Sequence, residues 1–159
     1  MTAMKIGRLD AEISGARLVL AGRIDDSAGA LADLVRQLPA GDVVIDTSGV
    51  TFVNSVGMRE WMRAIRALRE RGTVTFEAVA DVLITQMNLI PEFTGVQIAS
   101  FHAQYLCPAC GNEATPLIDV ATHGAGLRAM KAPKMPCPEC GAAMDLGDFP
   151  ERYLSLFRT

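Results

Sequence analysis

The sequence predicts an α/β protein with a small metal-binding module near its C-terminal end. Two observations support this organisation. Across residues 1–101, short apolar runs typical of strands alternate with segments of helical spacing, the order that gives parallel strands joined by right-handed crossovers. After Phe101 that periodicity is lost, and two Cys-x-x-Cys pairs follow. We therefore expect a sheet domain over 1–101, a metal-bound module over 102–148 and a helix over 149–159.

The N-terminal segment predicts a hairpin and then a helix. Ile6–Ile13 alternates weakly and Arg17–Ile24 strongly between apolar and polar residues, which indicates two strands around a Ser14–Gly15 turn. Apolar side chains then recur at helical spacing over residues 28–38, and Pro39 is expected to end that helix.

The central stretch that follows is the most informative. Val43–Ile45 is too short and too β-branched for a helix, so we expect a buried strand there, with Asp46–Gly49 turning the chain. Asn54 and Ser55 are good N-cap residues, and the helix that they begin is expected to end at Gly72. The apolar stripe of that helix falls at i, i+3, i+4, i+7 and i+10: Met58, Trp61, Met62, Ile65 and Leu68.

Four further elements complete the expected sheet domain. They are a strand over 73–76, a short helix over 82–89, a loop over 88–95 and a last strand over 96–101.

The start of the central helix has a chemical consequence for Ser55. A helix N-terminus presents unpaired N–H groups and a positive dipole end, which both favour an anion such as a phosphate. Arg59, four residues further on, is placed to add a charge-assisted hydrogen bond. The alternative is that Asn54 or Ser55 only caps the helix, and caps are much commoner than phosphorylation sites.

The residues of this loop resemble a known family. The run Asp46–Gly57, DTSGVTFVNSVG, is similar to the signature loop of STAS domains, the anti-sigma-factor antagonists of bacteria, over about the first 100 residues of the chain. Ser55 matches the serine that a partner kinase phosphorylates in that family, and Gly57 matches its glycine. Asn54 stands where the family usually has aspartate, which keeps the capping geometry and removes the charge.

The resemblance implies a fold and a role. It implies a mixed sheet with helices packed mainly on one side, and a bacterial signalling protein whose serine loop and following helix bind a partner. That partner would be a serine kinase or anti-sigma factor, or another STAS protein, and phosphorylation of Ser55 would weaken the docking.

The helix after Ser55 also carries a strongly basic side, with Glu60 and Glu70 as the only acidic residues among the charges. Its arginines are Arg59, Arg63, Arg66, Arg69 and Arg71. A solvated face is the usual meaning of such a pattern, but like charges three and four residues apart do not stabilise a helix. We therefore give equal weight to a second interpretation, in which this side is a docking face for an acidic partner. Its residues would be Asn54, Ser55, Arg59, Arg63 and Arg66.

The C-terminal module repeats one motif, Cys-Pro-x-Cys-Gly, at Cys107–Gly111 and Cys137–Gly141. Each is a knuckle in which the glycine permits a tight turn that aims both thiolates at one ion. Cys107, Cys110, Cys137 and Cys140 thus supply four soft ligands, which predicts a structural zinc ribbon with no open coordination position. Redox chemistry and an iron–sulfur cluster are the alternatives.

We also predict the structure of the segment between the two knuckles and of the tail, and the role of the two histidines. Pro116–Val120 reads as a strand of the ribbon, and residues 122–126 as a flexible stretch. In the tail, Phe149–Phe157 follows helix-start signals and is expected to pack on the sheet or the ribbon. His102 and His123 are unnecessary as metal ligands.

Composition excludes several classes of function. The net charge is −3, and residues 102–159 hold five Lys and Arg against six Asp and Glu, so nucleic-acid binding through the ribbon is the least favoured function. No apolar run approaches the roughly 20 residues of a membrane span, and the N-terminal residues do not form a secretory signal. Reduced cysteines therefore predict a cytoplasmic protein.

No catalytic constellation is found in the sequence, so we expect an interaction protein and not an enzyme. The first hypothesis is a STAS-like signalling module switched at Ser55. The second is a non-switching scaffold that assembles with itself or with others, with a structural zinc ribbon as an added contact surface. Asn54 in place of aspartate favours the second.

Overall fold

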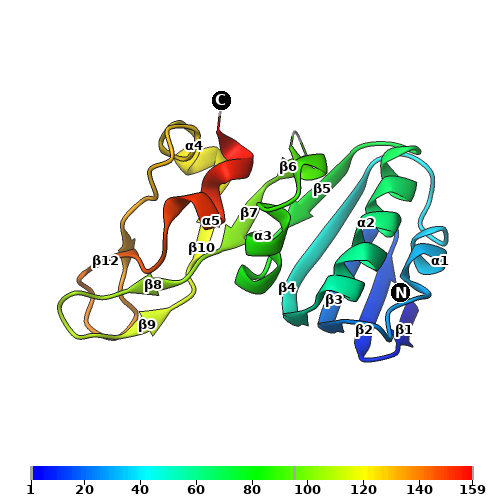
Figure 1. The fold of residues 1–159 in the computed structure, drawn as a ribbon, viewed down its shortest axis with the longest axis horizontal. Coiled ribbons are helices and arrows are strands. Elements are labelled where there is room, and N and C mark those ends of the chain that lie inside the picture. Colours follow the sequence, from blue (N-terminus) through cyan, green and yellow to red (C-terminus); the bar gives the residue numbers. More distant parts are fainter. Residues whose placement is uncertain (1, 95, 159) are drawn as a thin grey trace.

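The computed structural model describes residues 2–94 and 96–158 of the chain. Met1 of the predicted sheet domain, Gly95 of the predicted loop over 88–95 and Thr159 of the predicted C-terminal helix lie outside the described residues. The chain forms two parts that lie side by side, a sheet part and a cysteine module (Figure 1). The predicted α/β class is confirmed.

The sheet part is built on six strands in the order β1-β2-β3-β4-β5-β6. Their bounds are Thr2–Ile6, Leu9–Ser14, Arg17–Ile24, Val43–Val53, Val74–Glu77 and Gln97–Ile98. The first three strands pair antiparallel, and β3 to β6 pair parallel, so the sheet is mixed. Parallel neighbours require crossovers, which the helices supply.

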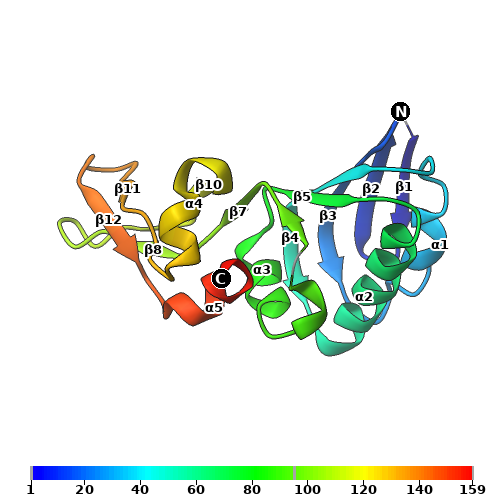
Figure 2. The same ribbon diagram turned by 90° about the horizontal axis from the view of Figure 1, so that it is seen from above.

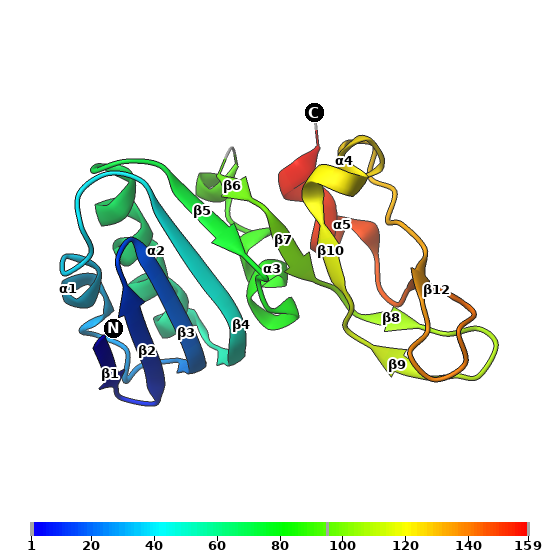
Figure 3. The same ribbon diagram turned by 180° about the vertical axis from the view of Figure 1, so that it is seen from behind.

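Three helices cover one face of this sheet, and the other face is bare (Figures 1 and 3). They are α1 (Leu31–Val35), α2 (Ser55–Arg69) and α3 (Asp81–Met87). The core lies between them and the strands: Trp61 of α2 is buried with its ring centroid 5.8 Å from that of Phe76 on β5. On the bare face, Arg17 bridges Asp46 and Glu77 across three strands.

The cysteine module has a four-stranded antiparallel sheet of very short strands in the order β11-β12-β8-β9. Their bounds are Met135–Pro136, Ala143–Leu146, Tyr105–Leu106 and Glu113–Ala114. A separate two-stranded ladder, β7 (Ser100–His102) with β10 (Leu117–Asp119), joins the module to the sheet part. Helix α4 (Val120–Arg128) follows, and the tail forms α5 (Pro150–Leu154) and the 3-10 turn η2 (Ser155–Phe157).

Two predictions for the N-terminal segment are wrong in their bounds. The expected strand Ile6–Ile13 is two strands, because Gly7 takes a φ of +59° and begins a hairpin between β1 and β2. The expected helix over 28–38 is regular only over Leu31–Val35, with turns on either side.

The expected turn at Asp46–Gly49 is also wrong, because β4 runs straight through it. Two residues of β4, Thr47 and Ser48, oppose the single residue Leu20 of β3, so the polar segment forms a β-bulge. Asp46 accepts a hydrogen bond from the Ser48 N–H (2.9 Å), which is the local preference that suggested a turn. Asp46 and Ser48 therefore lie inside a strand.

Gly72 does not end α2 in the predicted way. The helix ends at Arg69, and Gly72 lies two residues beyond the C-cap Glu70, against the backbone of Gly41. A Cβ on Gly72 would come within 2.3 Å of the Gly41 carbonyl carbon. The glycine is thus required by a close approach of two loops.

Three predictions for residues 96–126 differ from the structure. The expected strand over 96–101 breaks at Ala99, so β6 stays in the large sheet and β7 leaves it. Pro116–Val120 does contain a strand, β10, but it pairs with β7 and not with the ribbon. Residues 122–126 are not irregular: they lie in α4, which begins where Asp119 accepts a hydrogen bond from the Thr122 N–H (2.9 Å).

The tail packs as expected, and it does so against the sheet part. α5 lies beside α3 (Figure 2), and Tyr153 and Leu154 are buried. The Phe157 ring stacks on Phe101 of β7 with centroids 5.2 Å apart.

Candidate functional site

The two cysteine knuckles have the same backbone geometry. In the first, the Gly111 N–H donates to the Cys107 carbonyl (2.9 Å), and the Cys107 N–H donates to the Asn112 carbonyl (2.8 Å). The second repeats both bonds at the same lengths, from Gly141 to Cys137 and from Cys137 to Ala142. Gly111 and Gly141 have φ values of +77° and +78°, a conformation that a side chain would strain. The sequence repeat is therefore a structural repeat.

The knuckles face one another and bring the four predicted ligands together. All four Sγ atoms lie within 4.8 Å of one another, with 3.5 Å between Cys107 and Cys140 and 3.7 Å between Cys110 and Cys137. These separations exclude disulfides, whose sulfurs lie about 2.05 Å apart. They fit a tetrahedral ion with metal–sulfur bonds of about 2.3 Å, which places its ligands about 3.8 Å apart. The cluster can hold one metal ion.

The knuckle turns also favour the thiolate form of the two buried cysteines. The pKa of Cys137 is lowered to about 6, chiefly because the backbone N–H groups of Cys140 and Glu139 point at its sulfur and outweigh desolvation. The pKa of Cys107 is lowered for the same reason, by the N–H groups of Cys110 and Ala109. Because the thiolate is the form that binds a metal, this backbone geometry prepares these two ligands, whereas the neighbouring cysteine sulfurs raise the pKa of Cys110 and Cys140.

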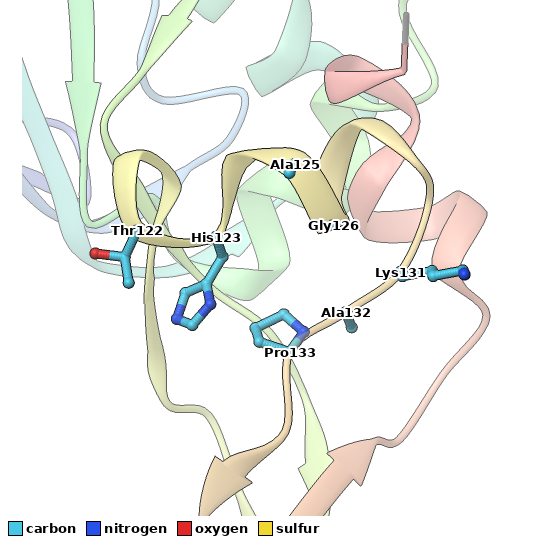
Figure 4. A pocket seen from close by; sticks show the side chains of 7 residues that line it. All are labelled: Thr122, His123, Ala125, Gly126, Lys131, Ala132 and Pro133. Atoms are coloured by element: carbon cyan, nitrogen blue, oxygen red, sulfur yellow. The ribbon is translucent and has the colours of Figure 1, made fainter.

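Neither histidine belongs to the cluster. His102 lies on β7, where its Nδ1 is 2.8 Å from the Thr115 carbonyl oxygen. His123 lies on α4 and points toward Pro133 across an open hollow of about 340 Å³ (Figure 4). The lysine beside that hollow, Lys131, points away from it, so no set of polar groups converges there.

The Ser55 loop forms the second candidate site. Asn54 has an extended backbone, and its Oδ1 accepts a hydrogen bond from the Gly57 N–H (2.8 Å), which confirms the predicted N-cap. Ser55 is the first residue of α2, a helix of 15 residues, and its side chain is exposed. The neighbouring Val56 is also exposed, to 39%. The first N–H groups of a helix have no partner within it, so this end carries the positive pole of the dipole.

Gly57 explains why the loop has its glycine. The start of α2 crosses the end of β3, and a Cβ on Gly57 would lie 1.8 Å from the Ile24 carbonyl oxygen and 2.8 Å from the Asp25 nitrogen. The same Ile24 oxygen accepts the Asn54 N–H (3.3 Å). The glycine lets two backbones touch, and their contact fixes the position of the serine.

A buried carboxylate lies beneath this contact and was missed by sequence reasoning. The first helix has Ala30 as its N-cap, and Asp25, which precedes it, is 1% exposed. Its carboxylate accepts hydrogen bonds from the Ser27 hydroxyl (2.5 Å), the Ser27 N–H (2.9 Å), Arg8 (3.1 Å) and Arg23 (3.3 Å). These donors, Ser27 first, hold its pKa well below the usual range. The sequence feature that could have indicated its burial is its position directly after the apolar Ile24, at the end of a strand.

The basic side of α2 is largely paired within the chain. Glu92, on the 3-10 turn η1 (Pro91–Phe93), forms two hydrogen bonds to Arg66, one of 2.8 Å to Nε, and its carbonyl accepts one from Arg69 (3.2 Å). Arg71 donates to the Val35 carbonyl (3.3 Å) and the Leu38 carbonyl (2.5 Å), near the C-terminal end of α1.

The predicted docking residues therefore separate into two groups. Asn54, Ser55 and Arg59 lie at the start of α2, with Arg63 one turn further on, 3.4 Å from Glu60. Arg66 is held by Glu92.

Comparison with known proteins adds no family. Neither the models of known protein families nor the curated proteins include a match to this chain.

Over the described residues 2–94 and 96–158, no helix is long and apolar enough to cross a membrane.

Proposed function

We propose that this chain is a non-enzymatic bacterial signalling protein of the STAS type that works by binding another protein. The observation that carries the proposal is the exposed Ser55 at the first residue of a capped, 15-residue helix. A mixed sheet covered by helices on one face supports the same fold type (Figure 3). The docking surface is the Ser55 loop with Arg59 and Arg63, and the partner is a serine kinase or anti-sigma factor.

Phosphorylation of Ser55 is the proposed switch. A phosphate there adds close to two negative charges at the positive end of α2, within one helical turn of Arg59. That charge alters the surface presented to a partner, and repulsion by an acidic partner would weaken the docking.

The matched variants for this switch are Ser55→Asp and Ser55→Ala, because Asn54 and not Ser55 supplies the helix cap. Ser55→Asp should lose at least about tenfold in affinity for a partner that Ser55→Ala still binds, measured by titration with the purified partner. Equal affinity of the two variants would remove the switch and leave a constitutive interaction.

A second candidate is a non-switching scaffold in the cytoplasm that assembles with itself or with other STAS proteins. Asn54 in place of the family's aspartate favours it, and so does the pairing of Arg66 with Glu92, which leaves fewer free charges for an acidic partner. Native mass spectrometry of the protein from its own cells separates the two: a phosphate lost in Ser55→Ala supports the switch, and its absence under growth and stress supports the scaffold.

For the cysteine cluster we propose a structural Zn²⁺. Four thiolates close the coordination sphere, so the ion would hold the module together and leave no position for a substrate. The same mass measurement distinguishes zinc from an iron–sulfur cluster. Nucleic-acid binding through the module stays least favoured, because Lys134 is paired with Asp145.

A further inference from the structure

We propose that metal loading of the cysteine module sets whether Glu92 holds Arg66 and Arg69 of α2, so that the module regulates the charge of the proposed docking helix. The proposal rests on metal binding by the cluster, and it concerns residues far from the cysteines in sequence. The route consists of three consecutive contacts, from the ribbon to the tail, from the tail to α3, and from η1 to α2.

The first contact fixes the start of the tail to the ribbon. β12 pairs with β8, with Leu146 opposite Tyr105, and the Gly147 N–H donates to the Gln104 carbonyl (2.7 Å). α5 begins three residues later, at Pro150. Because the ribbon strands are two to four residues long, their pairing depends on the ion that joins the knuckles.

The second contact is made by Asn88, the C-cap of α3. Its Oδ1 accepts a hydrogen bond from the Leu156 N–H of the tail (2.8 Å), and its Nδ2 donates to the Ile84 carbonyl inside α3 (2.8 Å). The amide therefore clamps the tail to the end of the helix. The stacked pair Phe157 and Phe101 holds the same region of the tail to β7.

The third contact follows within four residues. Asn88 leads into η1, where Glu92 binds Arg66 and Arg69, and Phe93 is buried in the core. Loss of the metal would unfold the ribbon and release the tail at Gly147, so that the tail would be held by its own packing on the sheet part and its hydrogen bond to Asn88 would break more often. The segment 88–93 would then be held by buried Phe93 and by its own turn hydrogen bonds, without the contact from the tail, and the two arginines would spend more time free for a partner.

The test is hydrogen exchange on the full chain, loaded with zinc and after removal of zinc by a chelator, with metal content followed by native mass spectrometry. We expect amides of residues 84–93 to exchange about tenfold faster without zinc, and amides of β2 to β4 to be unchanged. In the nitrogen NMR spectrum of the zinc-free protein, the Arg66 Nε–H signal should shift toward the position expected for an unpaired arginine. A protein that loses zinc with residues 84–93 unchanged would overturn the coupling and leave the zinc site standing.

Asn88 gives the matched pair of variants. Asn88→Ala removes the acceptor, so in the zinc-loaded protein residues 88–93 should already exchange faster, and chelation should add less than about twofold. Asn88→Asp keeps the acceptor for Leu156 but loses the donor to the Ile84 carbonyl, so residues 88–93 should exchange faster than in the unaltered chain while most of the response to chelation is kept. A full tenfold response in Asn88→Ala would show that the coupling does not pass through this residue. Failure of the chain to bind zinc would overturn the metal proposal itself, and the mass measurement reports that outcome separately.

Discussion

The two parts of this molecule reach a defined fold by different means. The sheet part buries large apolar side chains between six strands and three helices, among them Trp61, Phe76, Leu18 and Ile45. The four strands of the cysteine module have few such residues, and the large side chains that they bury are Tyr105 and Met144. Burial stabilises the first part at roughly 25 cal/mol per Å² of apolar area, but the second buries little such area, and we propose that an ion at its four cysteines supplies the rest. On this proposal, one chain combines a core-stabilised domain and a metal-stabilised one.

The difference between the two means of stabilisation is smaller where the tail contacts the sheet part. Phe101 stacks on Phe157 of the tail, the tail residue Leu154 is buried, and Asn88 adds a hydrogen bond to the tail. The module is therefore attached by packing although it is organised by cysteines. Four substitutions test how far the two means of stabilisation are independent.

The largest effect is expected from the cysteines. Cys107→Ser, or zinc removal, should abolish ordered structure over residues 105–146, because metal binding contributes about 10 kcal/mol or more to such modules. Two-dimensional NMR of the whole chain would show loss of the dispersed amide signals of the module, with those of β2 to β5 retained. Ala109→Ser, on the exposed tip of the same knuckle, is the control. Collapse of the complete spectrum would mean that the two parts fold as one.

A second variant destabilises the sheet part and leaves the cysteine ligands unchanged. Gly57→Ala should lower the free energy of unfolding of the sheet part by about 3 kcal/mol, since its Cβ would meet the Ile24 carbonyl oxygen at 1.8 Å. Urea unfolding measures this, and zinc content should not change. Gly29→Ala, where a Cβ would meet nothing within 4 Å, should change stability little. A stable Gly57→Ala protein would show that α2 can shift away from β3.

The helix cap is expected to have a smaller effect. Asn54→Ala removes the acceptor of the Gly57 N–H and should cost about 1 kcal/mol in urea unfolding. Asn54→Asp keeps an acceptor, places a negative charge at the positive end of the helix and should retain or raise stability. Equal losses in both would indicate that the amide itself makes the contribution.

The smallest expected effect is a gain in stability from a substitution at Ala78, between β5 and α3. Ala78 has a φ of +48°, a left-handed conformation that costs a residue with a Cβ about 1 kcal/mol. Ala78→Gly should therefore raise the free energy of unfolding by about 0.5 kcal/mol. Ala3→Gly, in the regular strand β1, should lower it by a similar amount, and the two midpoints in urea would show opposite signs.

Much of the fold follows from the sequence where local preference and tertiary contact agree. The helix after Asn54 was predictable because its cap, its apolar stripe and its length all indicate the same element. The metal cluster was predictable because the repeated Cys-Pro-x-Cys-Gly motif determines both the ligands and the turn.

The failures occur where tertiary contact overrides local preference. Asp46–Gly49 has the composition of a turn, but pairing with β3 on one side, and with β5 at Asp46 on the other, keeps it in a strand with a bulge. Helix α4 contains Gly124 and Gly126, poor helix formers, and forms because Asp119 caps it and Leu127 is buried. The paired state of Arg66 was also hidden, because Glu92 lies 26 residues away in sequence.

The pairing of Arg66 and Arg69 with Glu92 bears on how any acidic ligand of α2 would respond to ionic strength. An unpaired arginine gains the full attraction of a new carboxylate, which salt screens, whereas an arginine that exchanges an existing carboxylate for a new one gains little attraction for salt to screen. Affinity for such a ligand should then fall less steeply with added salt than the four arginines of α2 suggest. Glu92→Gln, which weakens the internal pair, should make the slope steeper.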